Sequence, residues 1–282
     1  MGAGVMARLT TLLRDDAMLQ ICDHGDGLAV VFQHGLGGGE AQVAQAFPPG
    51  PGLRRITLEC RGHGASGLGS RRPFSLEMFA DDVVAAADEA GLDGFVAGGI
   101  SMGAAIALRL ACRLPDRVAG LLLVRPAWIF DCAPVNLRPI AEVARLILGH
   151  GPDKARAIFA QSETAARLQR EAPDNLASLF GYFDRPDAAP FAQVLADIAA
   201  DSPGVSARDA AGLGIPTLVI GNAMDAVHPL SAAHMLAAAI PGATFAEIHP
   251  KALDSVRHFA ELQAEITTFL HTCSNSRSLV PS

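Results

Sequence analysis

The chain has 282 residues, of which half are hydrophobic, and a formal net charge of −7 at pH 7. This length allows one α/β domain with an insertion or two small domains, and the apolar content is sufficient for a large core. The negative charge argues against a nucleic-acid partner, and five scattered cysteines without a Cys-x-x-Cys pair argue against a disulfide framework and a structural zinc site.

The N-terminal stretch, residues 1–13, has too short an apolar core for a signal peptide and lacks a cleavage pattern. No uncharged apolar run elsewhere in the chain reaches membrane-spanning length. Cysteines that form no framework suit a reducing compartment. We therefore expect a cytoplasmic protein that has no membrane partner.

A glycine-rich loop, His34–Gly39, follows the first predicted strand, Leu28–Gln33. The loop lacks the Gly-Lys-Ser/Thr of a P-loop and the spacing of a dinucleotide fingerprint. Such a loop can instead present a backbone amide to a developing negative charge, as an oxyanion hole does. We interpret His34 as a structural histidine that holds this loop, and a catalytic role or contact with a substrate is the alternative.

The next two elements are a strand at Leu53–Glu59 and a helix that ends near Glu89. Ser75 is a suitable N-cap for this helix, because a serine side chain can accept a hydrogen bond from the first turn. Gly91 follows the last helical residue and favours the end of the helix there.

The stretch Gly99–Gly103 reads Gly-Ile-Ser-Met-Gly and lies between a predicted strand, Phe95–Ile100, and a helix of small residues that runs to Arg113. Gly-x-Ser-x-Gly in this context is the pattern of a nucleophile elbow, a turn so tight that its flanking residues must be small. Glycine lacks the Cβ atom that would collide in such a turn. The pattern favours Ser101 as a nucleophile over an incidental serine in a glycine-rich connection.

The pattern of strands stops after Val118–Val124 and the residues Arg125 to Trp128. Turns rich in Pro, Gly and Asp then separate helical stretches, which we predict at residues 139–148, 154–170, 176–183 and 191–199. This indicates an all-helical insertion at residues 130–206. The predicted α/β core comprises residues 1–129 and 207–271, and residues 272–282 are predicted to form a disordered tail.

Strand and helix alternate again after the insertion. A strand at 216–221, a helix at 231–240, a strand at 244–248 and a helix at 254–271 are predicted. Such alternation implies a mostly parallel, doubly wound sheet covered by helices on both faces. Ligands bind such sheets beyond the carboxyl ends of the strands. His34, Ser101, Arg125 and Asp225 each follow a predicted strand, so we expect them to converge.

Four motifs together resemble the α/β-hydrolase superfamily, and the resemblance covers nearly the whole chain. They are His34-Gly35-Leu36-Gly37, Arg61-Gly62-His63-Gly64-x-Ser66, Gly99-Ile100-Ser101-Met102-Gly103 and Gly221-x-x-x-Asp225. The resemblance implies that the helical insertion is a cap over the active site. It also implies that Ser101 is the nucleophile, that Asp225 is the acid, and that the backbone amides of Leu36 and Met102 form the oxyanion hole. A turn residue or helix cap is the alternative role for Asp225.

The general base is the part of the site that departs from the family pattern. The family usually places Gly-His after the last strand, but Ile248–Asp254 contains no such pair, and His258 is expected inside the final helix. We favour His228, because it lies three residues after Asp225 on one loop, from which it could reach the serine hydroxyl while Asp225 orients it. His249 is the alternative base. A third possibility is that His228 only packs beside Asp225 and the triad is incomplete.

The leading functional hypothesis is hydrolysis of an ester or thioester through an acyl-Ser101 intermediate, with no cofactor and no metal. An acyltransferase that uses a thioester or carrier donor, and a non-catalytic ligand-binding protein, are the alternatives. Arg125 and Trp128 are candidate substrate contacts, with an ion pair and core packing as their respective alternatives. The expected partner is a small acyl substrate, free or on a carrier protein, and the exposed cap faces suggest a homodimer.

Overall fold

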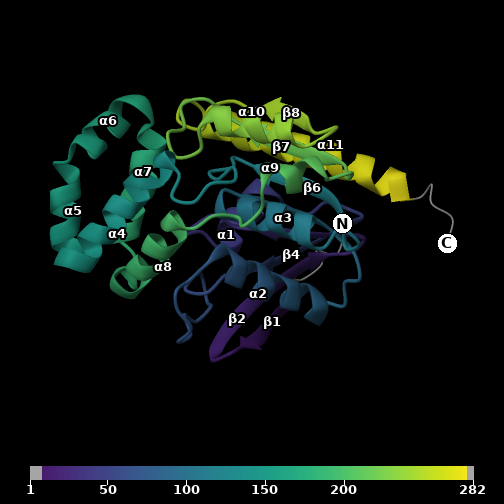
Figure 1. The fold of residues 1–282 in the computed structure, drawn as a ribbon, viewed down its shortest axis with the longest axis horizontal. Helices are drawn as coiled ribbons and strands as arrows, with labels where there is room; N and C mark the ends of the chain where they lie inside the picture. Colours follow the sequence, from purple (N-terminus) through teal and green to yellow (C-terminus); the bar gives the residue numbers. More distant parts are fainter. Residues whose placement is uncertain (1–7, 278–282) are drawn as a thin grey trace, which may run out of the picture.

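The computed structural model describes residues 8–277, and its centre is a twisted sheet (Figure 1). Within these residues the sheet has eight strands in the order β1-β2-β4-β3-β5-β6-β7-β8. The strands are β1 (Arg8–Arg14), β2 (Ala17–Gly25), β3 (Leu28–Gln33), β4 (Leu53–Leu58), β5 (Phe95–Ile100), β6 (Val118–Val124), β7 (Thr217–Gly221) and β8 (Thr244–Glu247). β2 runs antiparallel to both of its neighbours, and all other pairs are parallel. The predicted mostly parallel sheet is confirmed.

Helices cover both faces of the sheet. α1 (Glu40–Ala46) and α11 (Ser255–Arg277) lie on one face, where Val43 and Leu262 belong to the same apolar cluster as Phe32 of β3. α2 (Leu76–Glu89), α3 (Met102–Arg113) and α10 (Leu230–Ala239) lie on the other face, around residues such as Val31. Because successive residues of a strand point to opposite faces, Val31 and Phe32 enter different cores. The fold is therefore doubly wound, as predicted.

The segment between β6 and β7 forms a separate helical layer at one end of the sheet, at the left of Figure 1. It contains a 3-10 turn η1 (Val135–Leu137) and the helices α4 (Arg138–His150), α5 (Pro152–Ala160), α6 (Glu163–Glu171), α7 (Pro173–Phe183) and α8 (Ala188–Ala200). The short α9 (Ala207–Ala211) leads back to the core. We call residues 130–206 the cap. Its buried side chains join the apolar cluster of the α2/α3 face, so cap and core are packed together.

Two predictions inside the cap need correction. The single helix predicted at 154–170 is two helices, because Ser162 accepts a hydrogen bond from the Ala165 N–H at 3.1 Å and starts α6 as its N-cap. The stretch from Pro173 to Asn175, predicted as a turn, is the first turn of α7, where proline is well tolerated at the first position.

The sequence reasoning also missed the N-terminal hairpin of β1 and β2. Its two-residue turn, Asp15–Asp16, has Asp15 at φ 53°, a conformation that aspartate tolerates in tight turns. At the other end α11 continues to Arg277, so the expected tail is helical as far as that residue. Residues 278–282, and residues 1–7 of the stretch considered for a signal peptide, lie outside the described residues.

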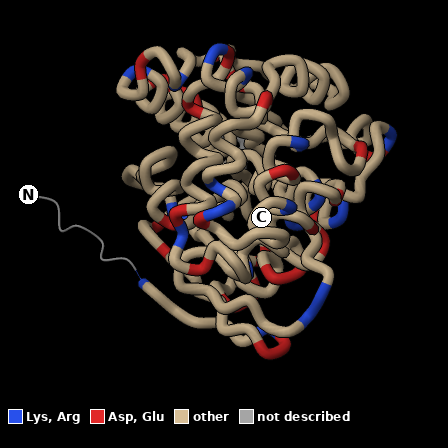
Figure 2. The backbone as a smooth tube through the Cα atoms, turned by 90° about the vertical axis from the view of Figure 1, so that its left-hand side faces the viewer, with Lys and Arg blue, Asp and Glu red and all other residues tan. Residues whose placement is uncertain are grey.

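Two local predictions in the core are confirmed. The Ser75 side chain accepts a hydrogen bond from the Met78 N–H at 3.0 Å and caps α2, and Gly91 follows that helix at φ 71°. In the view of Figure 2, Lys/Arg and Asp/Glu positions are scattered over the backbone and interspersed with each other. None of the helices in the described part of the chain combines the length and the apolar character needed to cross a membrane.

Candidate active site

Ser101 lies on a strained turn between β5 and α3. Its backbone has φ 56° and ψ −108°, a region that non-glycine residues avoid unless the surrounding structure enforces it. A Cβ on Gly99 would lie 2.4 Å from the Gly103 carbonyl carbon, and a Cβ on Gly103 would lie 2.3 Å from the Gln33 oxygen. Both glycines are therefore required by close backbone approach, as the elbow pattern predicts.

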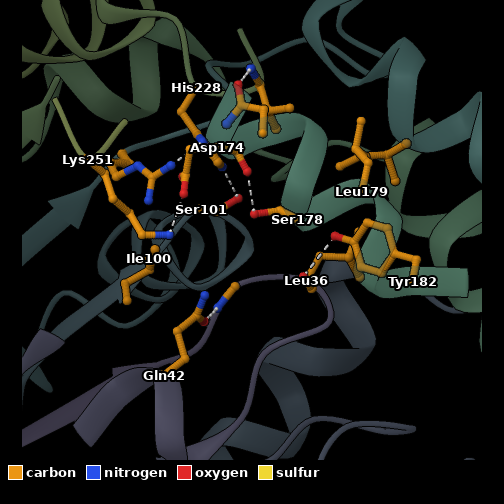
Figure 3. A pocket seen from close by; sticks show the side chains of 15 residues that line it. Leu36, Gln42, Ile100, Ser101, Asp174, Ser178, Leu179, Tyr182, His228 and Lys251 are labelled. Atoms are coloured by element: carbon orange, nitrogen blue, oxygen red, sulfur yellow. Dashed lines mark hydrogen bonds and ion pairs between the residues drawn. The ribbon is translucent and has the colours of Figure 1, made fainter. Parts of the chain in front are cut away.

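His228 is hydrogen-bonded to both Ser101 and Asp225, and Figure 3 shows its contact with Ser101. His228 Nε2 lies 2.8 Å from Ser101 Oγ, and His228 Nδ1 lies 2.9 Å and 3.0 Å from the two carboxylate oxygens of Asp225. An ionised carboxylate can only accept hydrogen bonds, so its contact assigns the imidazole proton to Nδ1. Nε2 is then free to accept the proton of the serine hydroxyl.

A hydrogen bond within the loop brings Asp225 and His228, three residues apart, close to each other. Asp225 Oδ1 accepts a hydrogen bond from the His228 backbone N–H at 2.9 Å, which forms a turn of the kind that aspartate side chains favour. Met224, at φ 57°, directs the chain into this turn, and Pro229 leads out of it into α10. Acid and imidazole are thus held together by local geometry.

Arg125 contacts the Asp225 carboxylate from the end of β6. Its Nε and Nη2 atoms donate to Asp225 Oδ2 at 2.9 Å and 2.5 Å, and the Asp225 side chain is only 2% exposed. Burial alone would raise the pKa of Asp225, but the charges of Arg125 and His228 and their hydrogen bonds outweigh it and hold that pKa well below its ordinary value. Arg125 lines the pocket, yet its guanidinium is engaged in this ion pair, the alternative that the sequence left open.

Two backbone amides next to Ser101 are available for an oxyanion. Within the part of the chain that the structure describes, neither the Leu36 N–H nor the Met102 N–H donates to a protein acceptor. Leu36 lines the same pocket as Ser101, and Met102 is the first residue of α3, where amides point out of the helix end. The carbonyl of Leu36 is held by the Tyr182 hydroxyl at 3.0 Å.

The pocket above Ser101 has a volume of about 110 Å³ and lies between the core and α7. Apolar side chains such as Ile100, Leu179 and Val227 line part of it. Lys251, from the segment after β8, reaches the same pocket and pairs with Asp174 of α7 at 2.8 Å. The pocket is therefore small, with a mixed polar and apolar lining.

Three residues named as candidates lie outside this pocket. His249 is not among its lining residues, and its backbone N–H donates to Glu261 on α11. His34 is fully buried, with Nδ1 2.8 Å from the Gly35 carbonyl and Nε2 accepting the Cys60 N–H. Trp128 is also buried and donates to the Asp201 carbonyl. Backbone partners occupy the polar atoms of both side chains, which agrees with the structural role that we favoured for His34 and with core packing, the alternative for Trp128.

Sequence reasoning did not identify four polar residues at this site: Asn136, Asn175, Tyr182 and Lys251. The first three lie in the cap, where helical periodicity predicts the elements but not the neighbours of each side chain. Lys251 had one signal, since it lies in the segment where the family usually carries its histidine. No group of three or more His, Cys, Asp or Glu side chains among residues 8–277 is arranged to hold a metal ion.

Known proteins resemble this chain in sequence and in fold. The family described as alpha/beta hydrolase fold matches residues 29–254. A Klebsiella pneumoniae (strain 342) protein named "Putative carbamate hydrolase RutD" is 30% identical over 226 residues, which cover 78% of this chain and 82% of the relative. The crystal structure of the enol-lactonase from Burkholderia xenovorans LB400 has a TM-score of 0.71 at 24% identity and covers 93% of this chain and 100% of its own. A thermophilic esterase from Thermogutta terrifontis has a TM-score of 0.71 at 23% identity, with 96% and 100% coverage. The chain belongs to the α/β-hydrolase family of enzymes.

Proposed function

We propose that this chain is a serine hydrolase of small carboxylic esters or thioesters that works through an acyl-Ser101 intermediate. The observation that carries the proposal is the distance of 2.8 Å between His228 Nε2 and Ser101 Oγ. A nucleophile within hydrogen-bond reach of a base, which is itself oriented by a third group, is the arrangement that activates a serine hydroxyl. Asp225 is that third group.

The reaction then follows from the geometry. His228 Nε2 takes the proton of the Ser101 hydroxyl while Oγ forms a bond to the carbonyl carbon of the substrate. The carbonyl oxygen gains the negative charge, and the amides of Leu36 and Met102 are the donors that stabilise it. When the tetrahedral intermediate collapses, the carbon–oxygen or carbon–sulfur bond breaks, and His228 returns the proton to the leaving group.

In the second half of the reaction, water is the nucleophile and Ser101 is the leaving group. His228 takes a proton from water, the hydroxide oxygen attacks the acyl carbon, and Ser101 leaves with the proton that His228 gives back. Asp225 stays ionised throughout, because Arg125 keeps its pKa low, and it stabilises the imidazolium that forms in each half of the reaction.

The size of the pocket supports a short acyl group. A volume of about 110 Å³ is well below the range of about 300–1,000 Å³ of pockets that hold drug-sized ligands. The names of the relatives, a carbamate hydrolase, an enol-lactonase and an esterase, all denote hydrolysis at a carbonyl carbon. An ester or thioester with a short acyl chain is the substrate class that fits both points.

Fluorophosphonate labelling with intact-mass analysis tests the nucleophile and the base together. We expect one adduct on the parent protein and none on Ser101→Ala. His228→Ala should lower both labelling and ester hydrolysis by about 10⁴-fold or more, as loss of a triad base does elsewhere. His249→Ala is the matched control and should behave like the parent, because His249 does not line the pocket.

The same assays separate the rival functions. A folded parent that forms no adduct would refute the activated serine and favour a ligand-binding protein. Strong loss with His249→Ala and little with His228→Ala would move the base to the segment after β8. Product analysis in the presence of an alcohol or thiol acceptor distinguishes hydrolysis from acyl transfer, and we expect the free acid to dominate.

A further inference from the structure

Helix α7 of the cap presents one continuous face to the pocket. Asn175, Ser178, Leu179 and Tyr182 all line the pocket, and their spacing of three and four residues places them on one side of the helix. Figure 3 shows Ser178, Leu179 and Tyr182 on this helix, across the pocket from Lys251. The two ends of this face, Asn175 and Tyr182, are about 10 Å apart along the helix axis.

Asn175, at the first end, holds the loop that carries Asp225 and His228. Its Oδ1 atom accepts hydrogen bonds from the backbone N–H groups of Ala226 at 2.6 Å and Val227 at 3.1 Å. These are the two residues between the acid and the base. Backbone amides can only donate, so these contacts assign the oxygen of the Asn175 side chain. Asn175 is buried, with 4% of its surface exposed, and water cannot easily replace it.

A second asparagine of the cap, Asn136, binds the same loop through a backbone carbonyl group. Asn136 Nδ2 donates to the Val227 carbonyl at 2.6 Å and to the Ala127 carbonyl at 2.8 Å. The N–H and C=O groups of Val227 are therefore both bound by the cap, one by each asparagine. Hydrogen bonds from the cap therefore restrain the backbone of the loop between Asp225 and His228.

Tyr182, at the other end of the face, holds the loop of the predicted oxyanion hole. Its hydroxyl donates to the Leu36 carbonyl at 3.0 Å, and burial raises the pKa of Tyr182, so the hydroxyl keeps its proton. Arg185, just beyond α7, adds hydrogen bonds to the carbonyls of Gly37 and Gly62. The Leu36 carbonyl belongs to the peptide unit that directly follows the one containing the Leu36 N–H, so the Tyr182 hydrogen bond restrains the neighbouring peptide plane of this loop.

We propose that α7 sets the position of the general base relative to the oxyanion hole, with Asn175 and Tyr182 as positioning residues. The proposal rests on the proposed function, in which His228 and the Leu36 amide act on the same substrate carbonyl. One rigid helix contacts both catalytic loops, and the Lys251–Asp174 ion pair ties its first turn to the segment after β8. The cap thereby positions the catalytic groups and also lines the pocket.

Two substitutions at Asn175 test this with opposite expectations. Asn175→Leu removes the acceptor at similar volume, and Asn175→Asp keeps it. We expect kcat for a short-chain ester to fall about 10–100-fold in Asn175→Leu, with KM little changed, since a misplacement of 1 Å can cost about 100-fold. Asn175→Asp should recover most of kcat. Tyr182→Phe should lower kcat about tenfold, a part of the 10²–10³ that deletion of an oxyanion donor costs.

Gln193→Leu is the matched control, because Gln193 is an exposed amide on α8 that donates to Asp197 of the same helix and does not line the pocket. We expect its kcat and labelling rate to equal those of the parent, and all variants are compared at temperatures below their unfolding transitions. Equal kcat in the parent, Asn175→Leu and Tyr182→Phe would overturn the positioning role. The proposed function would still stand in that case if Ser101 of the parent is labelled. Loss of kcat in Asn175→Asp as large as in Asn175→Leu would also overturn it. A parent without labelling removes both proposals.

Discussion

Arg125 is the residue on which the ionised state of Asp225 depends most. Its guanidinium makes two hydrogen bonds to one oxygen of that carboxylate, and the exposed fractions of the two side chains are 13% and 2%. Arg125→Met keeps the aliphatic stem and removes the charge, which leaves a buried carboxylate with His228 as its remaining side-chain partner. Removing one partner of a buried pair costs about 3–5 kcal/mol, so we expect the free energy of unfolding to fall by about that amount at pH 7.

The pH dependence of this loss follows from the pKa of Asp225. In the parent that pKa lies below its ordinary value of 3.8, so the ion pair stabilises the fold above about pH 4 and its contribution is lost as pH falls through the folded-state value. In Arg125→Met the attraction is gone while burial remains, which raises the pKa. The carboxyl then takes up its proton in the folded state at a higher pH, and the difference from the parent should shrink as pH is lowered from 7 towards 4.

Urea denaturation of a double-mutant cycle measures this coupling. Arg125→Met, Asp225→Asn and the double variant are compared with the parent at pH 7 and pH 4.5. We expect the double variant to be more stable than the sum of the single effects predicts, because no charge is left unpaired. Arg125→Lys should lose less than Arg125→Met, since it retains a charge. Additive effects at pH 7, or an equal deficit at both pH values, would refute the reasoning.

Three further predictions concern the elbow, the buried histidines and the pocket. Gly103→Ala should lower the free energy of unfolding in thermal denaturation by at least about 1–3 kcal/mol, because its Cβ would meet the Gln33 oxygen, whereas Gly149→Ala, whose Cβ meets nothing within 4 Å, should not destabilise the protein. Burial, and after it repulsion from the neighbouring His34, holds the pKa of His63 well below 6.5. The free energy of unfolding should therefore fall as pH drops below about 6.5, by up to about 1.4 kcal/mol per pH unit. Urea titrations of His63→Asn should show a smaller slope. Leu179→Ala should raise kcat/KM for longer acyl esters relative to acetyl esters, and an unchanged chain-length profile would contradict the proposed pocket.

The features that the sequence predicted best are those that depend on local sterics. The elbow could be recognised because a turn with backbone atoms this close admits only glycine at two positions, Gly99 and Gly103. The strands of the core could be recognised because each is a short apolar run between turn residues. The contact between Asp225 and His228 could be predicted because the two residues lie on one loop, where a spacing of three residues limits their separation.

The features that it could not predict are set by packing between distant elements. β1 is an edge strand in which Leu9 and Leu13 are largely exposed, so its apolar pattern did not indicate a buried strand. The roles of Asn175 and Tyr182 depend on how the cap lies on the core, and an asparagine in a Pro-Asp-Asn sequence looks like a turn residue. Only the fold shows that its side chain meets the loop after β7.

The position of the proposed base, His228, after β7 also has a physical rationale in the sheet. All five residues of β7 are buried, whereas β8 is a four-residue edge strand whose residues are exposed or half-buried. β5 and β7 both pair with β6, so Ser101 and the acid–base loop lie two strands apart, about 10 Å, which an imidazole and its hydrogen bonds can bridge. A base on the inner strand therefore starts from a more rigid support than one on the edge. A base at this position requires a well-defined conformation of the loop 225–228. The two cap asparagines, Asn136 and Asn175, hold that loop.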